Sequence, residues 1–318
     1  MLARDVIGLG FAVRDTIGLV PHLPELDEGV ILEDLTLQGG GPVAQALVTL
    51  ARLGASVGFV GRLGDDAVGE EIRTGLAEEG IDLSFLQIEP GARSPQSMIL
   101  VDKPTGKRSI CAFPGTAGDI DLDDDTLAYL GSGRFLHLDG HSPEAALTAA
   151  NAAFRRGVRI CLDAGAGASI DPMLPLVEAT TVLIAAERFA MGVASNGAVE
   201  SGAAHLLHMG PEIVVVTRGE QGSSTWTRDT AFSTPGFPVT AVDTTGAGDV
   251  FHGAYLYGLL QGWDLVSTAE FAGAVAALKC TRLGGRAAIP RLPEVMDFLA
   301  ERGRHWPRSG NDPVQPEE

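Results

Sequence analysis

The sequence predicts an α/β protein in which helices flank one doubly wound, mainly parallel β-sheet. From residue 120 onward, short apolar runs alternate with helical patterns, which is typical of parallel strands joined by crossover helices. The run IVVVT at residues 213–217 has the β-branched, continuously apolar character of a strand buried on both faces. No internal repeat or low-complexity linker interrupts this alternation.

The first strand is predicted at residues 6–9, a short apolar run that ends at Gly10. Asp15 follows among apolar neighbours, just beyond that strand. Its two acceptor oxygens could hold the hydroxyls of a sugar. From composition alone, an aspartate that forms a turn is the simpler interpretation.

The segment Gly39-Gly40-Gly41-Pro42 opens a helix that is predicted at residues 43–53. Glycines allow a polar ligand to approach the backbone closely, and proline suits the first helical turn. A ligand-contacting helix start is therefore predicted at this point.

A strand predicted at residues 57–61 leads into another helix, and Asp65 and Asp66 stand where that helix starts. Carboxylates are favourable near a helix N-terminus. We therefore interpret this pair as helix-start residues and not as metal ligands.

Polar residues follow two later strands, predicted at residues 134–138 and 159–162. Asp139 and His141 come after the first of these strands and Asp163 after the second, at the edge where open α/β sheets bind ligands. His141 could contact a substrate or cap the helix predicted at 142–156. Asp163 could orient a magnesium-bound water or satisfy a nearby helix N-terminus. Both alternatives stay open.

The stretch DTTGAGD at residues 243–249 runs directly into a helix of small and apolar residues. Gly246 and Gly248 let the backbone bend so that successive N–H groups point at one spot, and the helix adds its positive end. Such a place attracts phosphate. A carboxylate at Asp249 would repel that ligand, so we interpret it as the acceptor of a proton from an attacking hydroxyl. The alternative is a plain turn with Asp249 as a helix cap.

Composition excludes several classes of function. Among 318 residues, Lys and Arg total 23 and Asp and Glu 41, which gives a net charge of −18. A chain this acidic is a poor candidate for binding nucleic acid or an anionic membrane. No apolar run reaches the roughly 18 residues that span a bilayer, and the N-terminus does not read as a signal peptide. Three widely separated cysteines predict buried thiols in a reducing cytoplasm.

DTTGAGD followed by a small-residue helix resembles the C-terminal signature of the ribokinase-like (PfkB) family of carbohydrate kinases. The resemblance extends from residue 5 to about 300 and implies one kinase domain at 1–305. It also implies the ribokinase-like fold, with a small β-sheet lid formed from about 11–37 and 93–113. Residues 306–318 are polar and Pro-rich, and we expect a disordered tail there.

The resemblance implies a role for each part of a kinase site. Asp249 becomes the catalytic base, and the backbone of Gly246, Ala247 and Gly248 becomes an anion hole. The T-x-G-x-x-G turn after the 213–217 strand implies that ATP is bound by Thr217, Gly219, Gly222 and Thr245. Asp243 becomes part of a site for a monovalent cation such as K⁺. The family's magnesium-positioning N-x-x-E falls on Ala186-Glu187-Arg188-Phe189, so only Glu187 remains as an acidic stand-in.

On the sugar side the resemblance implies binding by Asp15, Gly40, Gly41 and His141. The family's usual Asn falls on Ala44, which leaves the identity of the sugar open. The runs VDTTGAGDVFHGA and LKCTRLGGRAAIP look most similar to bacterial sulfofructose kinases, for whose sulfonate Arg108 and His141 are the nearest candidates here.

The predicted function is thus ATP- and Mg²⁺-dependent phosphorylation of a primary hydroxyl of a sugar, either a ketose or pentose or sulfofructose. A nucleoside kinase and a phosphofructokinase remain alternatives of the same mechanism. A non-catalytic sugar-binding regulatory protein is the alternative of another class. The resemblance also implies a homodimer formed through the lid.

Overall fold

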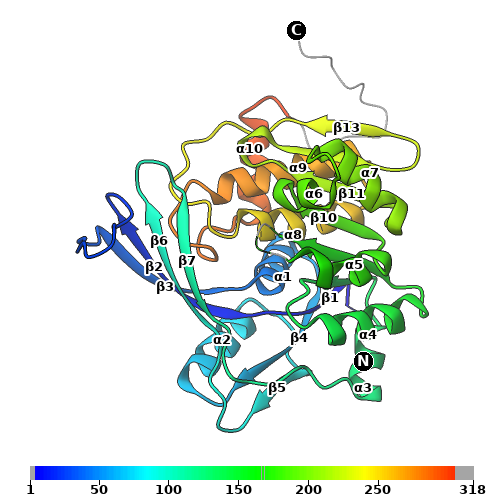
Figure 1. Cartoon of the computed structure of the whole chain (residues 1–318), viewed down its shortest axis with the longest axis horizontal. Helices are drawn as coiled ribbons and strands as arrows, with labels where there is room; N and C mark the ends of the chain where they lie inside the picture. The colour runs from blue at the N-terminus through cyan, green and yellow to red at the C-terminus, as the bar shows by residue number, and fades with distance from the viewer. Residues whose placement is uncertain (1–3, 166, 168, 305–318) are drawn as a thin grey trace.

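A nine-stranded sheet forms the centre of the structure, a computed structural model that describes residues 4–165, 167 and 169–304 (Figure 1). The predicted tail at 306–318 lies outside the described residues. The strands of this sheet are β1 (Val6–Leu9), β4 (Val57–Gly64), β5 (Leu86–Glu89), β8 (Phe135–Leu138), β9 (Arg159–Ala164), β10 (Val182–Ala186), β11 (Ile213–Thr217), β12 (Ser223–Trp226) and β13 (Ala231–Thr234). Their order is β13-β12-β11-β10-β9-β8-β1-β4-β5. Pairing is parallel from β11 to β5, and in this sheet only the pairs β11–β12 and β12–β13 are antiparallel, so that β12 runs against the other strands.

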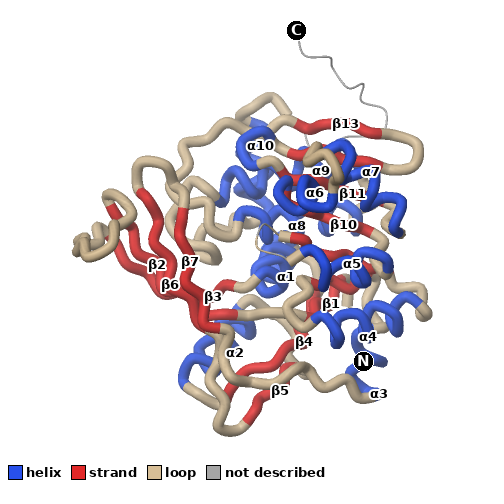
Figure 2. Tube along the Cα trace, viewed as in Figure 1, coloured by secondary structure: helices blue, strands red, loops and turns tan. Residues whose placement is uncertain are grey.

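Helices cover both faces of this sheet, so the predicted doubly wound fold is confirmed (Figure 2). One face packs against α1 (Pro42–Leu53), α2 (Ala67–Glu78), α8 (Ala247–Leu260), α9 (Leu265–Lys279) and α10 (Leu292–Ala300). The other packs against α3 (Asp124–Leu130), α4 (Pro143–Phe154), α5 (Ile170–Glu178), α6 (Glu187–Val193) and α7 (Val199–Met209). In β10, Val182 and Ile184 belong to the first core, and Leu183 and Ala185 belong to the second. The same holds for β11, where Ile213 and Val215 belong to the first core and Val214 and Val216 to the second, as the sequence predicted for residues 213–217.

The strand order reverses at β1. From β1 the chain proceeds to β4 and β5 on one side, then returns to β8 and continues through β9, β10 and β11 on the other. Ligands of open α/β sheets bind beyond the carboxyl ends of the strands at such a reversal. Gly10 and Asp139 stand directly after the two strands that meet there.

A second sheet of four strands projects to one side of the molecule (Figure 1). Its order is β3-β2-β6-β7, with β2 (Val13–Val20), β3 (Asp34–Gly40), β6 (Gln96–Asp102) and β7 (Arg108–Phe113). One face of this small sheet packs Ile17, Ile99 and Val101 against Leu283. This inner face of the small sheet therefore packs against the loop that precedes α10.

Two smaller predictions have different outcomes. Asp66 caps α2, since its carboxylate accepts a hydrogen bond from Gly69 N at 2.9 Å, so the helix-start interpretation is confirmed for Asp66. Asp65 instead accepts a hydrogen bond from Gly91 N at 2.8 Å. The expectation of buried thiols is wrong for Cys111, which is exposed on β7, whereas Cys161 and Cys280 are buried. Cys111 lies directly opposite Met98 on the neighbouring strand, and residues opposite each other share one face of a sheet. That face is the outer one, because Met98 is 68% exposed. Among the described residues, no helix has the length and apolarity to cross a membrane.

Candidate active site

The N-terminus of α8 forms the centre of the candidate site. Gly246 adopts the left-handed conformation (φ 73°) at the N-cap position, which glycine tolerates best, and α8 starts at the next residue. Within the described residues, no acceptor takes the N–H of Gly246 or Gly248, whereas the N–H of Ala247 donates to Thr244 O at 3.2 Å. Two of the three predicted anion-hole donors are thus free to bind a ligand.

Asp249 lies in the first turn of α8, but it does not cap the helix, because the N-cap residue is Gly246. None of the described residues donates a hydrogen bond to its carboxylate, which is left able to accept one from a ligand. Burial raises the pKa of Asp249, and the charges of His252 and Arg108 act against this. A carboxylate with a raised pKa is a better proton acceptor near neutral pH.

Asp15, on the small sheet, interacts electrostatically with this carboxylate. It is 5% exposed on β2, and its pKa is raised to about 7, mainly by burial. A hydrogen bond from Ser97 opposes that rise, and the charge of Asp249 adds to it. The two carboxylates therefore lie close enough to interact, although Asp15 lies on the small sheet and Asp249 on α8, which packs against the large sheet.

The glycines before α1 make room for protein groups. A Cβ atom on Gly40 would lie 2.0 Å from Oδ2 of Asp15. One on Gly41, whose φ is 97°, would lie 2.4 Å from the carbonyl oxygen of Phe11. The close approach seen here is therefore that of protein groups, since Asp15 and the loop after β1 pack against the start of α1, and the predicted ligand contact stays a prediction.

A buried arginine supports the same region. Arg286 is 8% exposed, and a Cβ atom on Gly39 would lie 2.0 Å from its guanidinium carbon. Its Nε lies 3.4 Å from Oε1 of Gln45, and its positive charge lowers the pKa of Asp15 against the effect of burial. Burial lowers the pKa of Arg286 itself to about 10. Sequence reasoning did not single out this arginine, because it lies in a loop far from Asp15 in the chain.

Asp139 joins the two loops at the strand reversal. Its carboxylate accepts hydrogen bonds from Phe11 N at 2.8 Å and from His141 N at 3.0 Å. The rings of Phe11 and His141 stack, with centroids 4.5 Å apart. Burial lowers the pKa of His141, but the hydrogen bond and charge of Asp139 outweigh it, so the pKa is raised. The N-cap of α4 is Ser142, so His141 is not that helix's cap.

Asp163 lies in β9, buried beside a histidine that sequence reasoning missed. His252, one turn beyond Asp249 on α8, places Nε2 3.4 Å from Oδ1 of Asp163 and Nδ1 2.7 Å from Gly248 O. The pKa of Asp163 is raised to about 7 by burial, and His252 acts against this. The sequence signal that could have identified His252 is that it is the one histidine in a helical run of otherwise small and apolar residues.

The predicted nucleotide residues lie at the end of β11. Gly219 and Gly222 have positive φ values of 59° and 90° in the turn after Thr217. A Cβ atom on Gly219 would meet open space, whereas one on Gly222 would lie 2.1 Å from Thr234 O. The hydroxyl of Thr245 is buried and has no hydrogen-bond partner, as expected if a ligand supplies one.

Glu187 begins α6, and its carboxylate forms an ion pair with a neighbouring arginine. Its Oε1 lies 3.1 Å from Nε of Arg218, which follows β11. Among the described residues, no group of three or more His, Cys, Asp or Glu side chains is arranged to hold a metal ion.

The sequence profile of pfkB family carbohydrate kinases matches residues 3–292. The chain belongs to this family. It is an ATP-dependent carbohydrate kinase. ATP-dependent ribose-1-phosphate kinase of Halopiger xanaduensis is 28% identical over 93% of this chain and 98% of its own. 5-Dehydro-2-deoxygluconokinase of Clostridium perfringens is 30% identical over 84% of this chain and 85% of its own.

A solved structure agrees with the observed fold of this pfkB kinase. Arabidopsis thaliana ribokinase, complexed with ribose and ATP, superimposes with a TM-score of 0.81 at 23% identity. That match covers 94% of this chain and 99% of the other. The ribokinase-like fold that the sequence predicted is therefore confirmed.

The small sheet also contacts the glycine-rich loop at residues 243–249. On β7, Arg108 donates from Nη1 to Oγ1 of Thr244 at 3.2 Å, and Thr244 donates through Oγ1 to Gly106 O at 3.0 Å. Strand β7 and the turn before it therefore contact the glycine-rich loop directly.

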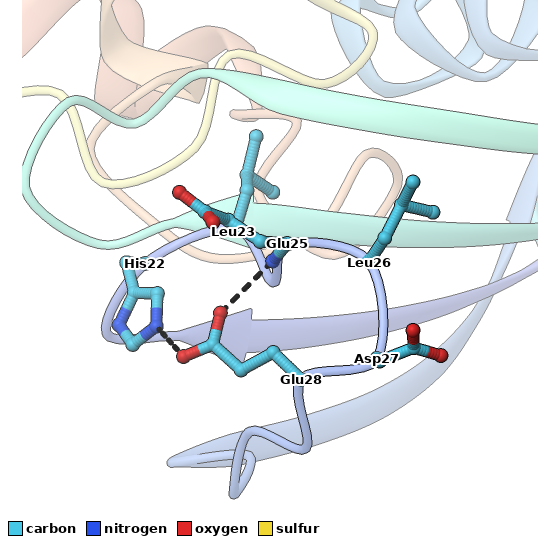
Figure 3. Close-up of a pocket in the computed structure, with 6 residues that line it drawn as sticks. All are labelled: His22, Leu23, Glu25, Leu26, Asp27 and Glu28. Atoms are coloured by element: carbon cyan, nitrogen blue, oxygen red, sulfur yellow. Dashed lines mark hydrogen bonds and ion pairs between the residues drawn. The ribbon is translucent and has the colours of Figure 1, made fainter.

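An open hollow at the far tip of the small sheet is not part of the kinase site (Figure 3). It lies within the connection between β2 and β3, where the Glu28 carboxylate contacts Nε2 of His22 at 2.8 Å and accepts from Glu25 N at 2.9 Å. These contacts fold the loop onto itself. None of the strand-end residues described above lines the hollow.

Proposed function

We propose that this kinase transfers the γ-phosphoryl group of ATP to a primary hydroxyl of a ketose or pentose bound between Asp15 and Asp249. The observation that supports it is the start of α8, where the N–H groups of Gly246 and Gly248 and the carboxylate of Asp249 have no hydrogen-bond partner among the described residues. The buried carboxylate of Asp15 on the small sheet interacts electrostatically with Asp249. Asp15 would accept hydrogen bonds from sugar hydroxyls, and His141, Gly40 and Gly41 would complete the sugar side.

In the proposed reaction, Asp249 takes the proton of the attacking hydroxyl. General base catalysis of this kind contributes typically about 10²–10⁴ in rate. The N–H groups of Gly246, Ala247 and Gly248, with the positive end of α8, would stabilise the transferring phosphoryl group. Of these, Ala247 must give up its turn hydrogen bond to Thr244 to take part fully.

ATP would lie along the carboxyl end of β11, contacted by Thr217, Gly219, Gly222 and Thr245. Mg²⁺ neutralises developing charge on the phosphates and is held in such sites by one or two carboxylates, phosphate oxygens and water. Asp163 fits this role, because it is buried and interacts with Asp249. We give Glu187 a smaller part, because Arg218 already occupies its carboxylate.

A neutral sugar fits the charges of the site better than an anionic one. Asp15, Asp163 and Asp249 all lie around the proposed sugar position and interact with one another or with their neighbours. Arg108 and His141 are the groups that favour an anionic substrate, such as a sugar phosphate or sulfofructose. Relatives of this chain act on both kinds of sugar, since one is a ribose-1-phosphate kinase and another, from Haemophilus influenzae, is a ribokinase.

We also propose that the small sheet is a lid and that it forms a homodimer contact. Its outer face exposes Leu35, Leu37 and Met98 by 54%, 57% and 68%. Residues directly opposite each other on β2, β3 and β6 share this face. The contact is tested by measuring the molecular mass of wild type and of Leu37→Asp in solution. The proposal requires that the wild type is a dimer and that Leu37→Asp dissociates more readily.

ATP consumption measured against a panel of substrates tests the function. The panel contains ribose, fructose, sulfofructose, 5-dehydro-2-deoxygluconate, ribose 1-phosphate, fructose 6-phosphate and a set of nucleosides. Turnover of a neutral ketose or pentose, with kcat/KM well above that for the anionic sugars and nucleosides, is expected. Sugar binding without ATP consumption for any compound would instead favour the regulatory alternative.

A further inference from the structure

The oxygens of Asp243 are already occupied by protein donors. Oδ1 accepts from Thr245 N and Oδ2 accepts from Gly284 N, each at 2.8 Å. The backbone carbonyl oxygen accepts from Nζ of Lys279, also at 2.8 Å. A K⁺ ion at the predicted site would need such oxygens as ligands. Each oxygen already accepts one N–H group, and the donor on the carbonyl is itself a cation that would repel K⁺, so the residues do not fit the predicted metal ion.

Lys279 is a buried cation in an unusual place. It is one of three lysines in the chain, with Lys103 and Lys107, and its side chain is 0% exposed. Burying an ammonium group is costly unless opposite charge and hydrogen-bond acceptors compensate. Burial lowers the pKa of Lys279, while the charges of Asp243 and Asp249 oppose that change. As the last residue of α9, it also lies at the negative end of that helix.

The neighbouring backbone ties the end of α9 to the glycine-rich loop. Cys280 O accepts hydrogen bonds from Val242 N at 2.8 Å and from Asp243 N at 3.3 Å. Together with the contact of Gly284, these bonds hold the chain just before Gly246 on both sides. The ammonium of Lys279 stands at the centre of this arrangement, on the carbonyl of Asp243.

We propose that the Lys279 ammonium acts as a built-in monovalent cation that fixes the loop at residues 243–245, so that this kinase needs no K⁺. The effect on catalysis rests on the proposed function, because it acts through the position of the Gly246–Gly248 N–H groups. The effect on the fold is independent of that function. Lys279 is accordingly a positioning residue, since it contacts the loop and not the reacting atoms.

The test compares wild type, Lys279→Ala, Lys279→Met and the control Lys103→Ala in KCl and in choline chloride at equal ionic strength. Lys103 is an exposed lysine at the end of the small sheet that pairs with Glu33. Thermal unfolding and kinase activity are both measured. Truncation to alanine leaves a space on Asp243 that K⁺ can enter, whereas methionine fills the space without a charge.

Wild type and Lys103→Ala should show the same Tm and the same kcat/KM in both salts. Lys279→Ala should lose about tenfold or more in kcat/KM in choline chloride and regain much of this activity in KCl. Its Tm should be about 2 °C or more higher in KCl than in choline chloride. Lys279→Met should lose the same activity and gain nothing from KCl.

A wild-type protein that K⁺ stabilises or activates over choline would overturn the proposal, whatever the variants do. Equal behaviour of Lys279→Ala and wild type in both salts would overturn it as well. If no sugar is phosphorylated by the wild type, the proposed function fails, and the Tm values alone still decide the role of Lys279.

Discussion

Gly40 and Asp15 are packed so closely that a single methyl group cannot be placed between them. A Cβ atom on Gly40 would stand 2.0 Å from Oδ2 of Asp15, although the two residues lie on adjacent strands of the small sheet. The glycine therefore fixes the place of the carboxylate that we assign to the sugar.

Gly40→Ala should raise the KM for the sugar by about tenfold or more, because Asp15 must move away from its binding position. The KM for ATP should change little, since the nucleotide residues lie beyond β11. Steady-state kinetics with both substrates varied checks this. Gly29→Ala is the matched control, because a Cβ atom there meets nothing within 4 Å. Equal kinetics for the two variants would contradict the role of Asp15.

Asp15→Asn should stabilise the protein increasingly as the pH rises. The pKa of Asp15 changes from 3.8 to about 7 on folding, chiefly through burial. Because its folded-state pKa is raised, the folded protein binds the extra proton, and stability falls as the pH rises from about 4 through 7. A pKa change of this size corresponds to roughly 4 kcal/mol.

The measurement is the difference in Tm between Asp15→Asn and wild type at pH 4 and pH 8. A small difference at pH 4 and a larger gain for the variant at pH 8 are expected. Asp34→Asn, on the exposed strand β3, serves as the control. A gain in Tm that is independent of pH would contradict the raised pKa of Asp15 in the folded protein.

Much of the fold follows from local patterns. The strand predicted at 6–9 coincides with β1, and the helix predicted at 43–53 is α1, extended by Pro42. Here the apolar periodicity and the glycine and proline signals agree with the tertiary structure. Strand β10 and helix α6 were not predicted as elements, because VLIAAERFAM passes from a strand to a helix with no glycine, proline or side-chain cap at the boundary.

Asp249→Asn should retain the fold and lose about 10²–10⁴ in kcat, because an amide cannot accept the proton of the attacking hydroxyl. The KM values should change far less than kcat. Thermal unfolding establishes that the variant is folded, and single-turnover kinetics separates chemistry from binding. Near-normal turnover would rule out Asp249 as the base.

Arg108→Ala should weaken the closure of the small sheet over the glycine-rich loop. Its Nη1 contact with Thr244 is the one side-chain hydrogen bond between β7 and that loop among the described residues. We expect kcat/KM to fall by roughly tenfold and uncoupled ATP hydrolysis to rise, since water then reaches the site. Lys107→Ala, next to it and exposed, should leave both quantities unchanged. If the two variants behave alike, Arg108 has no closing role.

The supporting residues of the site were harder to predict than the motif. DTTGAGD is contiguous, so spacing alone indicates a phosphate site. Asp139 joins loops 128 residues apart, since it accepts from Phe11 N, and Arg286 reaches Gln45 across 241 residues. Such contacts depend on which strands become neighbours. A single sequence places the residues at strand ends without showing their partners.

His252→Ala should shift the acid limb of the pH–rate profile to higher pH. Burial raises the pKa of Asp249, and His252 is the largest influence that acts against it, so loss of the histidine should raise that pKa further. A base that stays protonated to higher pH is inactive over a wider range. The Tm should also fall, because the ring contacts with Gly248 O and Ile184 O are lost.

The control His208→Ala removes a ring with the same kind of local contact. Nδ1 of His208 lies 2.7 Å from Ala204 O, four residues earlier on α7, as Nδ1 of His252 does from Gly248 O. His208 is exposed and lies on the opposite face of the large sheet, so its loss should leave the pH profile unchanged. A shift in the acid limb for His252→Ala alone would show that this histidine sets the protonation of Asp249. A drop in Tm without such a shift would limit His252 to a structural role.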